Sequence, residues 1–416
     1  MAELARRAEI EVQAPEPDLT AKQIVERAAA LKQKVRSEQD ASEQRGHHSE
    51  ELHRDFLEAG FYRMLQPRRF GGYEFDLPTF WRAMVKISEG DPGTGWCLTL
   101  ASHHAWVIGS HWPERAQREI FGPEGDFRAP HRPLPSGRAT RVDGGYVVSG
   151  VWDYCSGVPY STHMMGGAAV VGDDPDAPPD MLQVVVPREH FTMLDDWGGG
   201  THLGMQSSGS NSVRVEEAFV PEHWAVGADI MAPSAPTPGT ELHGNPMYLG
   251  LIGGVYHCGL VLTVVGAARA ALEEFEESIT TRKTMMPPQI PRYEHHDCQR
   301  VFGLARGMMD SSEELLYRIG EVYMELAERW ADTGDPFTRE DDVRLWGMAQ
   351  QAGKLAGEAV ELLFHSASSS SARRGTRLQR YFRDVTMYRQ HIAAQYLNLA
   401  TQFAKVHFGM PFGLPG

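Results

Sequence analysis

One short segment brings together an aromatic ring, a hydroxyl and a flexible backbone: Gly150-Val-Trp-Asp-Tyr-Cys-Ser-Gly157. It follows residues 145–150, a run typical of a β-strand. A flat heteroaromatic cofactor needs apolar packing on its faces and a few polar contacts at its edge. The segment offers both kinds of contact, and it predicts a cofactor site that includes Trp152, Tyr154 and Ser156.

Two further segments support this interpretation. One is Leu203-Gly-Met-Gln-Ser-Ser-Gly-Ser210, which continues to Pro221, and the other is Arg380-Tyr-Phe-Arg-Asp384. In this order and spacing, the three segments resemble the acyl-CoA dehydrogenase superfamily. They most resemble its flavin-dependent monooxygenase branch, the oxygenase components of two-component aromatic hydroxylases such as 4-hydroxyphenylacetate hydroxylase. The resemblance runs from about Leu19 to the C-terminus.

The resemblance implies flavin contacts for Ser207, Ser208 and Ser210, because this stretch matches a flavin-contacting loop of the superfamily. Serine and glycine supply the N–H and hydroxyl donors that a pyrophosphate or a ring carbonyl needs. It also assigns Ser156 to the hydroxyl beside the flavin ring, where it can hold a hydroperoxide adduct. The alternative for Ser156 is a loop serine that bonds its own backbone.

The resemblance implies that His391 is the catalytic base. In dehydrogenases that use a glutamate from this region, the matching stretch ends in Glu-Gly-Thr, whereas this chain has His391-Ile-Ala. The related hydroxylases carry a histidine there. Histidine titrates near neutral pH and can accept a phenol or hydroperoxide proton. We expect His391 on a late helix; the alternative is a surface or core histidine.

For the substrate, the resemblance implies contacts with Trp96, Tyr256 and His257. Trp96 lies in Gly93-Thr-Gly-Trp-Cys-Leu-Thr99, which is similar to a segment of the aromatic hydroxylases, and an aromatic wall suits an aromatic substrate. A core tryptophan is the alternative. Residues 215–268 contain no Lys or Arg, so the expected substrate is a neutral indole or phenol, unless Arg128, Arg132 or another cation reaches in.

Two arginines are expected to bind flavin phosphates. Arg282 matches an arginine that reaches the flavin of a neighbouring subunit in the family, and a planar guanidinium suits phosphate. Arg374 follows the serine-rich residues 366–371, which read either as a linker or as a loop that approaches the flavin across a subunit boundary. The chain departs from the dehydrogenase pattern at residues 128–136, which favours a transiently bound cofactor.

Composition excludes several classes of function. The 416 residues carry a formal net charge of −15, which disfavours nucleic acid and anionic membranes as partners. No uninterrupted apolar run approaches the ~20 residues of a membrane span, and no secretory leader is visible. We expect a cytoplasmic protein. The four cysteines form no Cys-x-x-Cys pair, and adjacent histidines point about 100° apart on a helix, so we expect no metal site.

Periodicity predicts helices, then strands, then helices again, and this α+β order is the acyl-CoA dehydrogenase-like fold that the resemblance implies. Thr20, Ser49 and Thr338 are expected to begin helices, and residues 138–149 are expected to form a strand. The expected organisation is a mobile arm (1–18), an N-terminal helical domain (19–120), a central β domain (121–235) and a C-terminal four-helix bundle (246–410).

These observations predict a monooxygenase component that hydroxylates a small aromatic through a flavin hydroperoxide, using O2 and reduced FMN or FAD. No Gly-x-Gly-x-x-Gly lies between a strand and a helix, so a separate NAD(P)H-flavin reductase is expected. The resemblance also implies a homo-oligomer, a tetramer or a dimer. The alternatives are an acyl-CoA dehydrogenase with tightly bound FAD and a non-enzymatic flavin-binding protein.

Overall fold

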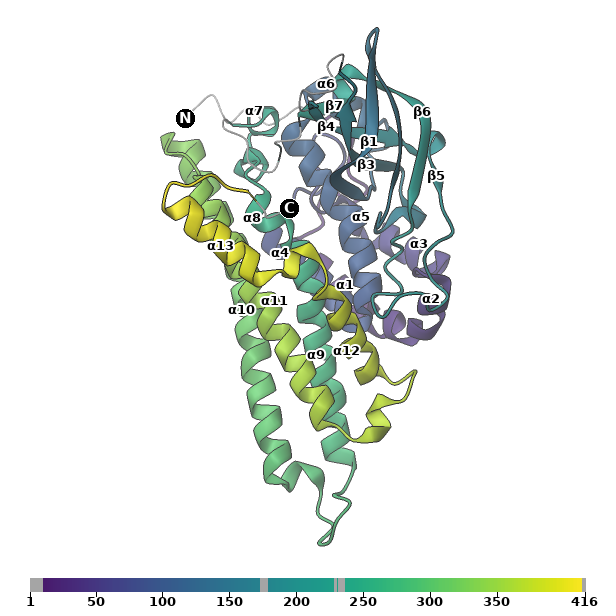
Figure 1. The fold of residues 1–416 in the computed structure, drawn as a ribbon, viewed down its shortest axis with the longest axis vertical. Coiled ribbons are helices and arrows are strands. Elements are labelled where there is room, and N and C mark those ends of the chain that lie inside the picture. Colours follow the sequence, from purple (N-terminus) through teal and green to yellow (C-terminus); the bar gives the residue numbers. More distant parts are fainter. Residues whose placement is uncertain (1–9, 173–178, 228–229, 231–235, 414–416) are drawn as a thin grey trace.

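The computed structural model describes residues 10–172, 179–227, 230 and 236–413. Along these residues helices come first, then a sheet, then helices again (Figure 1). This order confirms the expected α+β architecture. Residues 1–9 of the expected mobile arm lie outside the described residues. From residue 10 onward the chain lies against the body of the protein, where Glu11 forms ion pairs with Arg69 and Arg118.

The N-terminal helices begin where the capping residues predict. The hydroxyl of Thr20 accepts a hydrogen bond from the backbone N–H of Gln23, whose side chain accepts one in return from the backbone of Thr20. Ser49 caps its helix through the N–H of Leu52. The helices are α1 (Ala21–Ser37), α2 (Gln39–Arg45), α3 (Glu50–Ala59), α4 (Leu77–Gly90), α5 (Pro92–His111) and α6 (Glu114–Phe121).

The central sheet has the strand order β5-β6-β2-β1-β3-β4-β7. β1 pairs with β3 in parallel, and the other described pairs are antiparallel. The strands are β1 (His131–Val142), β2 (Gly145–Trp152), β3 (His163–Val170), β4 (Met181–Pro187), β5 (Thr192–Met193), β6 (Val213–Pro221) and β7 (Ala225–Gly227).

The single strand expected at residues 138–149 is wrong. Val142 pairs with Gly145, so Asp143 and Gly144 form a two-residue turn between β1 and β2. Gly144 has φ +77°, a conformation that glycine adopts at little cost and that hairpin turns of this length require.

The C-terminal part is helical. It contains α7 (Pro238–His243), α8 (Gly253–Tyr256), α9 (Cys258–Thr281), α10 (His296–Thr333), α11 (Arg339–Ser366), α12 (Arg377–Tyr388) and α13 (Tyr396–His407). α9 packs against α4, α5, α10, α11 and α12. Residues 253–281 are long and apolar enough to cross a membrane, but 89% of their most apolar window is buried within the fold. These side chains therefore form the core between the two helical regions.

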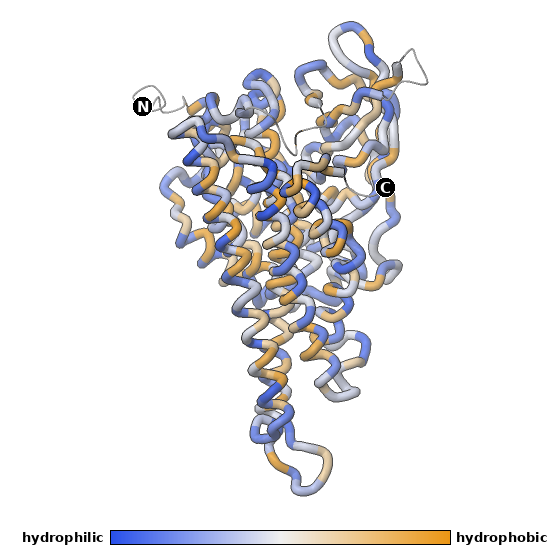
Figure 2. Tube along the Cα trace, turned by 60° about the vertical axis from the view of Figure 1, so that its left-hand side comes forward, coloured by the Kyte–Doolittle hydropathy of each residue, from blue (hydrophilic) through white to orange (hydrophobic). Residues whose placement is uncertain are grey.

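Two apolar cores hold the parts together. The larger core joins the N-terminal and C-terminal helices, and the smaller core lies within the sheet. Hydrophobic positions recur along the long C-terminal helices, interrupted by polar ones (Figure 2). This is the pattern of helices that bury one face against their neighbours.

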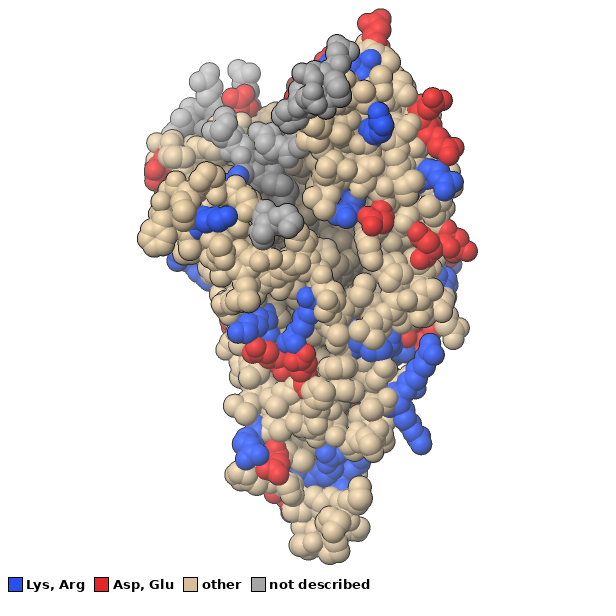
Figure 3. Space-filling model, viewed as in Figure 1, with Lys and Arg blue, Asp and Glu red and all other residues tan. Residues whose placement is uncertain are grey.

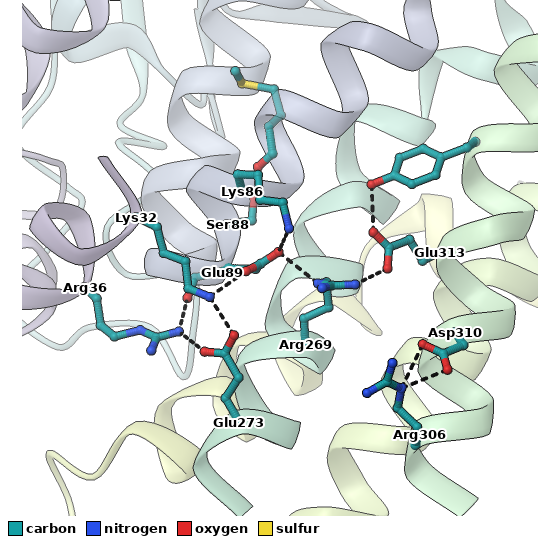
Figure 4. Close-up of polar contacts among 12 residues, drawn as sticks. Lys32, Arg36, Lys86, Ser88, Glu89, Arg269, Glu273, Arg306, Asp310 and Glu313 are labelled. Carbon is teal, nitrogen blue, oxygen red and sulfur yellow. Dashed lines mark hydrogen bonds and ion pairs between the residues drawn. The ribbon is translucent and has the colours of Figure 1, made fainter. Parts of the chain in front are cut away.

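A cluster of ion pairs also connects the N-terminal helices to the C-terminal helices. The Glu89 carboxylate on α4 is 2% exposed and lies 2.7 Å from Lys32 on α1, 2.7 Å from Lys86 and 2.9 Å from Arg269 on α9 (Figure 4). Burial raises the pKa of Glu89, but the bonds from the two lysines outweigh burial and lower it overall. This Glu89 cluster joins α1, α4 and α9, and α4 and α9 both contact α5.

Candidate active site

The segment after β2 turns sharply at the edge of the sheet. Tyr154 has φ +55° and is 51% exposed, and Gly157 has φ +88°. Between them Ser156 is 7% exposed. The turn therefore presents an aromatic ring at the surface and a hydroxyl just beneath it.

Ser156 belongs to a chain of hydroxyl groups. Its Oγ lies 2.7 Å from Oγ of Ser210, which lies 2.6 Å from Oγ of Ser208. The indole N–H of Trp96 donates to Ser156 Oγ at 3.0 Å. Segments that are far apart in the sequence thus meet at one point, and the structure brings Ser156, Ser208, Ser210 and Trp96 together.

Two of the expected cofactor residues face elsewhere. The hydroxyl of Ser207 donates to the buried carboxylate of Asp91, the residue that caps α5. Trp152 is 0% exposed within the sheet core, and its indole N–H donates to the carbonyl of Gly167 at 2.9 Å. Trp152 is the last residue of β2 and lies in the sheet core, whereas Tyr154 lies on the turn that follows the strand, where a positive φ leaves its ring exposed.

The Arg380–Asp384 motif anchors the loop that carries Ser207, Ser208 and Ser210, which we call the serine loop. Asp384 Oδ1 accepts a 2.6 Å hydrogen bond from the backbone N–H of Met205. A Cβ added to Gly204 would lie 2.2 Å from the carbonyl oxygen of Arg383, so the loop approaches α12 as closely as only glycine allows. Burial raises the pKa of Asp384 to about 8. The motif therefore positions the loop that carries Ser207, Ser208 and Ser210.

Aromatic rings continue from Trp96 into the protein. The ring centroids of Trp96 and His391 are 5.8 Å apart, those of His391 and His257 are 6.5 Å apart, and those of His257 and Tyr256 are 5.5 Å apart. His257 also stacks on Trp346 at 4.9 Å. The four expected residues Trp96, Tyr256, His257 and His391 therefore form one cluster, which we call the ring cluster.

The expectation that His391 lies on a helix is wrong. α12 ends at Tyr388, and His391 lies on the turn that follows, where its backbone N–H donates to the carbonyl of Tyr388 at 2.9 Å. Burial lowers the pKa of His391 to about 4, and the charge of Arg132 contributes. Burial also lowers the pKa of His257 to about 3. Both imidazoles are therefore neutral at pH 7 and able to accept a proton.

Sequence reasoning missed two histidines at the inner side of the cluster. The hydroxyl of Tyr256 lies 3.1 Å from Nε2 of His104 and 2.9 Å from Nδ1 of His131. His104 Nδ1 donates to the carbonyl of Ala129 at 2.7 Å. The sequence carries no local signal for this contact, because Tyr256 is more than a hundred positions from either histidine.

Charged side chains stand at the margins of the site. Arg132 pairs with Asp153 at 3.2 Å, and its charge acts on His391 and Tyr256. Arg128 pairs with Asp126 and donates to the carbonyl of Tyr160. Of the two cations that the sequence analysis considered, Arg132 is therefore the one near the ring cluster.

The two expected phosphate ligands are solvent-exposed. Arg282 follows α9, and its Nη1 lies 3.0 Å from Oγ of Ser370 and 3.5 Å from Oγ of Ser368. A Cβ added to Gly200 would lie 3.2 Å from Nη2 of Arg374, so Arg374 borders the loop before the serine segment. The structure thus joins Arg282 to the serine-rich residues, whereas Arg374 lies against a different loop.

The residues present fit a flavin. A flat ring system needs an accessible apolar face, which Tyr154 provides, and edge contacts, which the hydroxyl chain provides. Exposed guanidinium groups suit phosphate. The surface is hollowed between the β domain and the C-terminal helices (Figure 3). Among the described residues, no group of three or more His, Cys, Asp or Glu side chains could hold a metal ion.

A known protein family and several known proteins match this chain. Residues 258–396 match the family described as acyl-CoA dehydrogenase, C-terminal domain. The flavin-dependent monooxygenase oxygenase subunit HsaA of Rhodococcus jostii (strain RHA1) is 29% identical over 359 residues, 85% of this chain and 90% of that protein. The oxygenase component of p-hydroxyphenylacetate 3-hydroxylase of Acinetobacter baumannii is 24% identical over 390 residues, 91% of this chain and 87% of that protein.

The fold is also shared with a solved structure. XiaF from Streptomyces sp., in complex with FADH2 and glycerol, superposes with a TM-score of 0.84 at 22% identity. The superposition covers 95% of this chain and 97% of that one. Residues 258–396 therefore match the acyl-CoA dehydrogenase C-terminal domain, and the chain as a whole is similar in sequence to the oxygenase subunits of flavin-dependent monooxygenases.

Proposed function

We propose that this protein uses reduced flavin and O2 to hydroxylate a small, neutral aromatic molecule. One observation carries the proposal: the hydroxyl chain of Ser208, Ser210 and Ser156 continues through the indole N–H of Trp96 into the ring cluster. The expected flavin contacts and the expected substrate contacts are therefore neighbours. A flavin bound at the hydroxyl chain and an aromatic substrate bound at the ring cluster would face each other.

Reduced FMN or FAD, when bound, supplies the electrons that activate O2. Tyr154 offers its exposed ring to one face of the cofactor. Ser156 is 7% exposed and points a hydroxyl toward its edge, where a fixed donor stabilises developing negative charge better than mobile water does. These contacts are few, and the ring of Tyr154 is open to solvent, which suits a cofactor that enters and leaves during turnover.

His391 accepts the proton that the substrate releases. It lies beside Trp96 in the ring cluster, and burial keeps its pKa near 4, so the neutral imidazole is present at pH 7. Trp96 and Tyr256 are 7% and 8% exposed, so the wall around His391 is shielded from water but reachable. General base catalysis needs the base to lie beside the proton that it removes, and a substrate held against Trp96 lies next to His391.

The substrate is an indole or a phenol in preference to an aromatic acid. Residues 215–268, which include Tyr256 and His257, contain no Lys or Arg. Arg132 is the cation near His391, and its guanidinium is paired with Asp153. A carboxylate buried here would lack a free cation, which costs several kcal/mol.

A separate reductase supplies the reduced flavin, and the active form is a homotetramer or a homodimer. Arg282 follows the end of α9 at the projecting tip of the C-terminal helices, far from the β domain of its own chain (Figure 1). A flavin phosphate bound by Arg282 therefore belongs to a neighbouring subunit. Sedimentation of the active enzyme tests this, and an active monomer would rule it out.

The experiment that tests the function omits any reductase. Protein is mixed anaerobically with chemically reduced flavin, then with O2 and indole, phenol or 4-hydroxyphenylacetate, and products are separated by chromatography. We expect hydroxylated indole or phenol that depends on both reduced flavin and protein. Bleaching of bound FAD by an acyl-CoA without O2 would indicate a dehydrogenase instead. A clear preference for 4-hydroxyphenylacetate would refute the neutral substrate.

A further inference from the structure

Arg132 lies where the β domain meets the ring cluster. It is the second residue of β1, and its neighbour His131 places Nδ1 2.9 Å from the hydroxyl of Tyr256. The side chain of Arg132 places Nε 3.2 Å from Oδ1 of Asp153, which directly precedes Tyr154 in the turn after β2. One cation therefore connects the turn that carries the proposed cofactor contacts with the strand that reaches the proposed substrate contacts.

The positive charge of Arg132 acts on both parts of the site. Burial lowers the pKa of His391 to about 4, and the charge of Arg132 adds to this shift. Burial raises the pKa of Cys155 to about 12, and the charge of Arg132 is the largest effect that opposes this rise. Cys155 directly precedes Ser156 of the hydroxyl chain, whereas His391 belongs to the ring cluster. The charge is therefore within reach of the proposed cofactor contacts and of the proposed substrate contacts.

The guanidinium of Arg132 keeps most of its hydrogen-bonding capacity. A guanidinium carries several N–H donors in a planar fork, and among the described residues the side chain of Arg132 bonds only Asp153, through Nε. Both side chains reach solvent, with 27% of Arg132 and 56% of Asp153 exposed. Arg128, by contrast, pairs with Asp126 and donates to the carbonyl of Tyr160. Both Nη groups of Arg132 are therefore available to an anion that enters from solvent.

A neutral aromatic substrate gives this cation no partner, but a reduced flavin does. Reduced flavin loses the proton at N1 near neutral pH and then carries a negative charge on its ring, whereas the oxidised ring is neutral. The phosphate of the cofactor is the same in both states. Charge near the ring nitrogens is one of the means by which a protein tunes a flavin, and a planar guanidinium suits a delocalised anion. A cation beside the ring therefore favours the reduced state.

We propose that Arg132 selects reduced flavin over oxidised flavin by directing its free N–H groups to the negative charge of the reduced ring. This inference rests on the proposed function, since it takes the flavin to bind at Tyr154 and the hydroxyl chain. Asp153 moderates the selection, because its carboxylate competes for the same guanidinium. The inference also agrees with a neutral substrate, since a cation that pairs with the cofactor is not free to pair with an aromatic acid.

Binding in both oxidation states tests this selection without turnover. FMN, and in a second series FAD, is titrated by calorimetry without O2 or substrate and at one fixed pH, once oxidised and once chemically reduced. We expect the wild type to bind the reduced form at least about tenfold more tightly than the oxidised form, the scale of one hydrogen bond to a charged group. Arg132→Met should weaken binding of the reduced form by about tenfold and change that of the oxidised form by less than about threefold. Arg132→Lys should lose less, because it keeps the charge but not the planar fork.

Asp153→Asn separates this role from a structural one. It removes the same ion pair as Arg132→Met but keeps the cation, so it should strengthen binding of the reduced form by about threefold. Arg138→Met, at an exposed position of the same strand, is the control and should leave both affinities unchanged. If Arg132→Met and Asp153→Asn both weaken binding, or if Arg132→Met affects the two oxidation states equally, Arg132 only holds the turn and the inference is refuted.

The remaining outcomes separate this inference from the proposed function. If Arg132→Met weakens binding of 4-hydroxyphenylacetate and leaves that of reduced flavin unchanged, the cation binds the substrate and the inference is refuted. If no variant alters the flavin affinities while the wild type forms hydroxylated product, the inference fails and the proposed function stands. If Arg132 selects reduced flavin but reduced flavin and O2 yield no hydroxylated product, the inference stands and the proposed function fails.

Discussion

Mild acid should destabilise this protein, because it buries many uncharged histidines. The pKa of each of these side chains is lowered to about 3 or about 4, and burial contributes most to the shift. They are His53, His103, His111, His131, His163, His243, His257 and His391. In the unfolded chain their pKa returns to about 6.5. Between these values the unfolded state binds more protons, so the free energy of unfolding falls as the pH is lowered through about 6.5.

The size of the effect follows from linkage. A histidine whose pKa rises from about 4 to about 6.5 on unfolding loses roughly 0.8 kcal/mol of stabilisation between about pH 7.5 and about pH 6. Eight such residues together lose roughly 6 kcal/mol. This is comparable with the whole stability of a typical domain, about 5–15 kcal/mol.

Buried carboxylates act in the opposite direction. Burial raises the pKa of Asp384 to about 8, of Glu74 to about 7 and of Asp342 to about 6. The folded state binds their protons more tightly than the unfolded state, so these groups add roughly 3.5 kcal/mol of stability over the same pH interval. The effect of the histidines is the larger one, so the free energy of unfolding falls by roughly 3 kcal/mol by about pH 6 and falls more steeply at lower pH.

Urea unfolding between about pH 7.5 and about pH 5.5, followed by circular dichroism, measures this loss. His48→Phe provides a single-site test, because His48 is 0% exposed and burial holds its pKa well below the ordinary value. The variant should reduce the slope of stability against pH by about 1.4 kcal/mol per pH unit at the acid end. The exposed His296→Gln serves as the control and should leave the slope unchanged. A wild-type stability that stays flat down to about pH 6 would contradict this reasoning.

Three further changes have defined outcomes. Glu89→Gln should lower the free energy of unfolding by about 2–3 kcal/mol, since its carboxylate is buried but its cations are partly exposed. Asp310→Asn, in the exposed ion pair of Figure 4, is the control and should lower it by less than about 1 kcal/mol in the same urea titration. His391→Asn should lower the rate of hydroxylation by roughly 10²–10⁴-fold, with flavin binding retained. Because the pKa of His391 is lowered, the wild-type rate should not fall between about pH 8 and about pH 6. A wild-type rate that falls below about pH 6.5, in a way that the variant does not show, would contradict the lowered pKa. Ser156→Ala should reduce product formed per reduced flavin by roughly 10–100-fold, and unchanged yield would show that the hydroxyl has no part in the reaction.

Signals that act over a few residues were readable from the sequence. The capping residues Thr20, Ser49 and Thr338 mark true helix starts, because a cap bonds the N–H only two or three positions ahead. The same local chemistry was overlooked at Asp143 and Gly144, where an aspartate–glycine pair in an alternating run indicates a hairpin.

Other parts of the site depend on contacts that no local pattern encodes. The resemblance implies a flavin contact for Ser207, yet its hydroxyl donates to Asp91, which lies 116 positions away. The partners of Tyr256 come from α5 and β1, and only the assembled fold brings them together. Resemblance to a family pointed to these residues, but the direction of each side chain required the structure.

The arrangement of the site follows from a single helix. α5 is buried along nearly its whole length. Asp91, which caps α5, accepts a hydrogen bond from Ser207, and Trp96, five residues later, donates one to Ser156. The serine loop and the turn after β2 are therefore both fixed to α5. Its inner face then continues through Thr99 toward the C-terminal helices. A substrate held against this helix is therefore held at a fixed distance from the turn that carries Ser156. A shift of α5 would disturb the proposed cofactor and substrate contacts together, and its neighbours α4 and α9 are joined by the buried Glu89 cluster as well as by apolar packing.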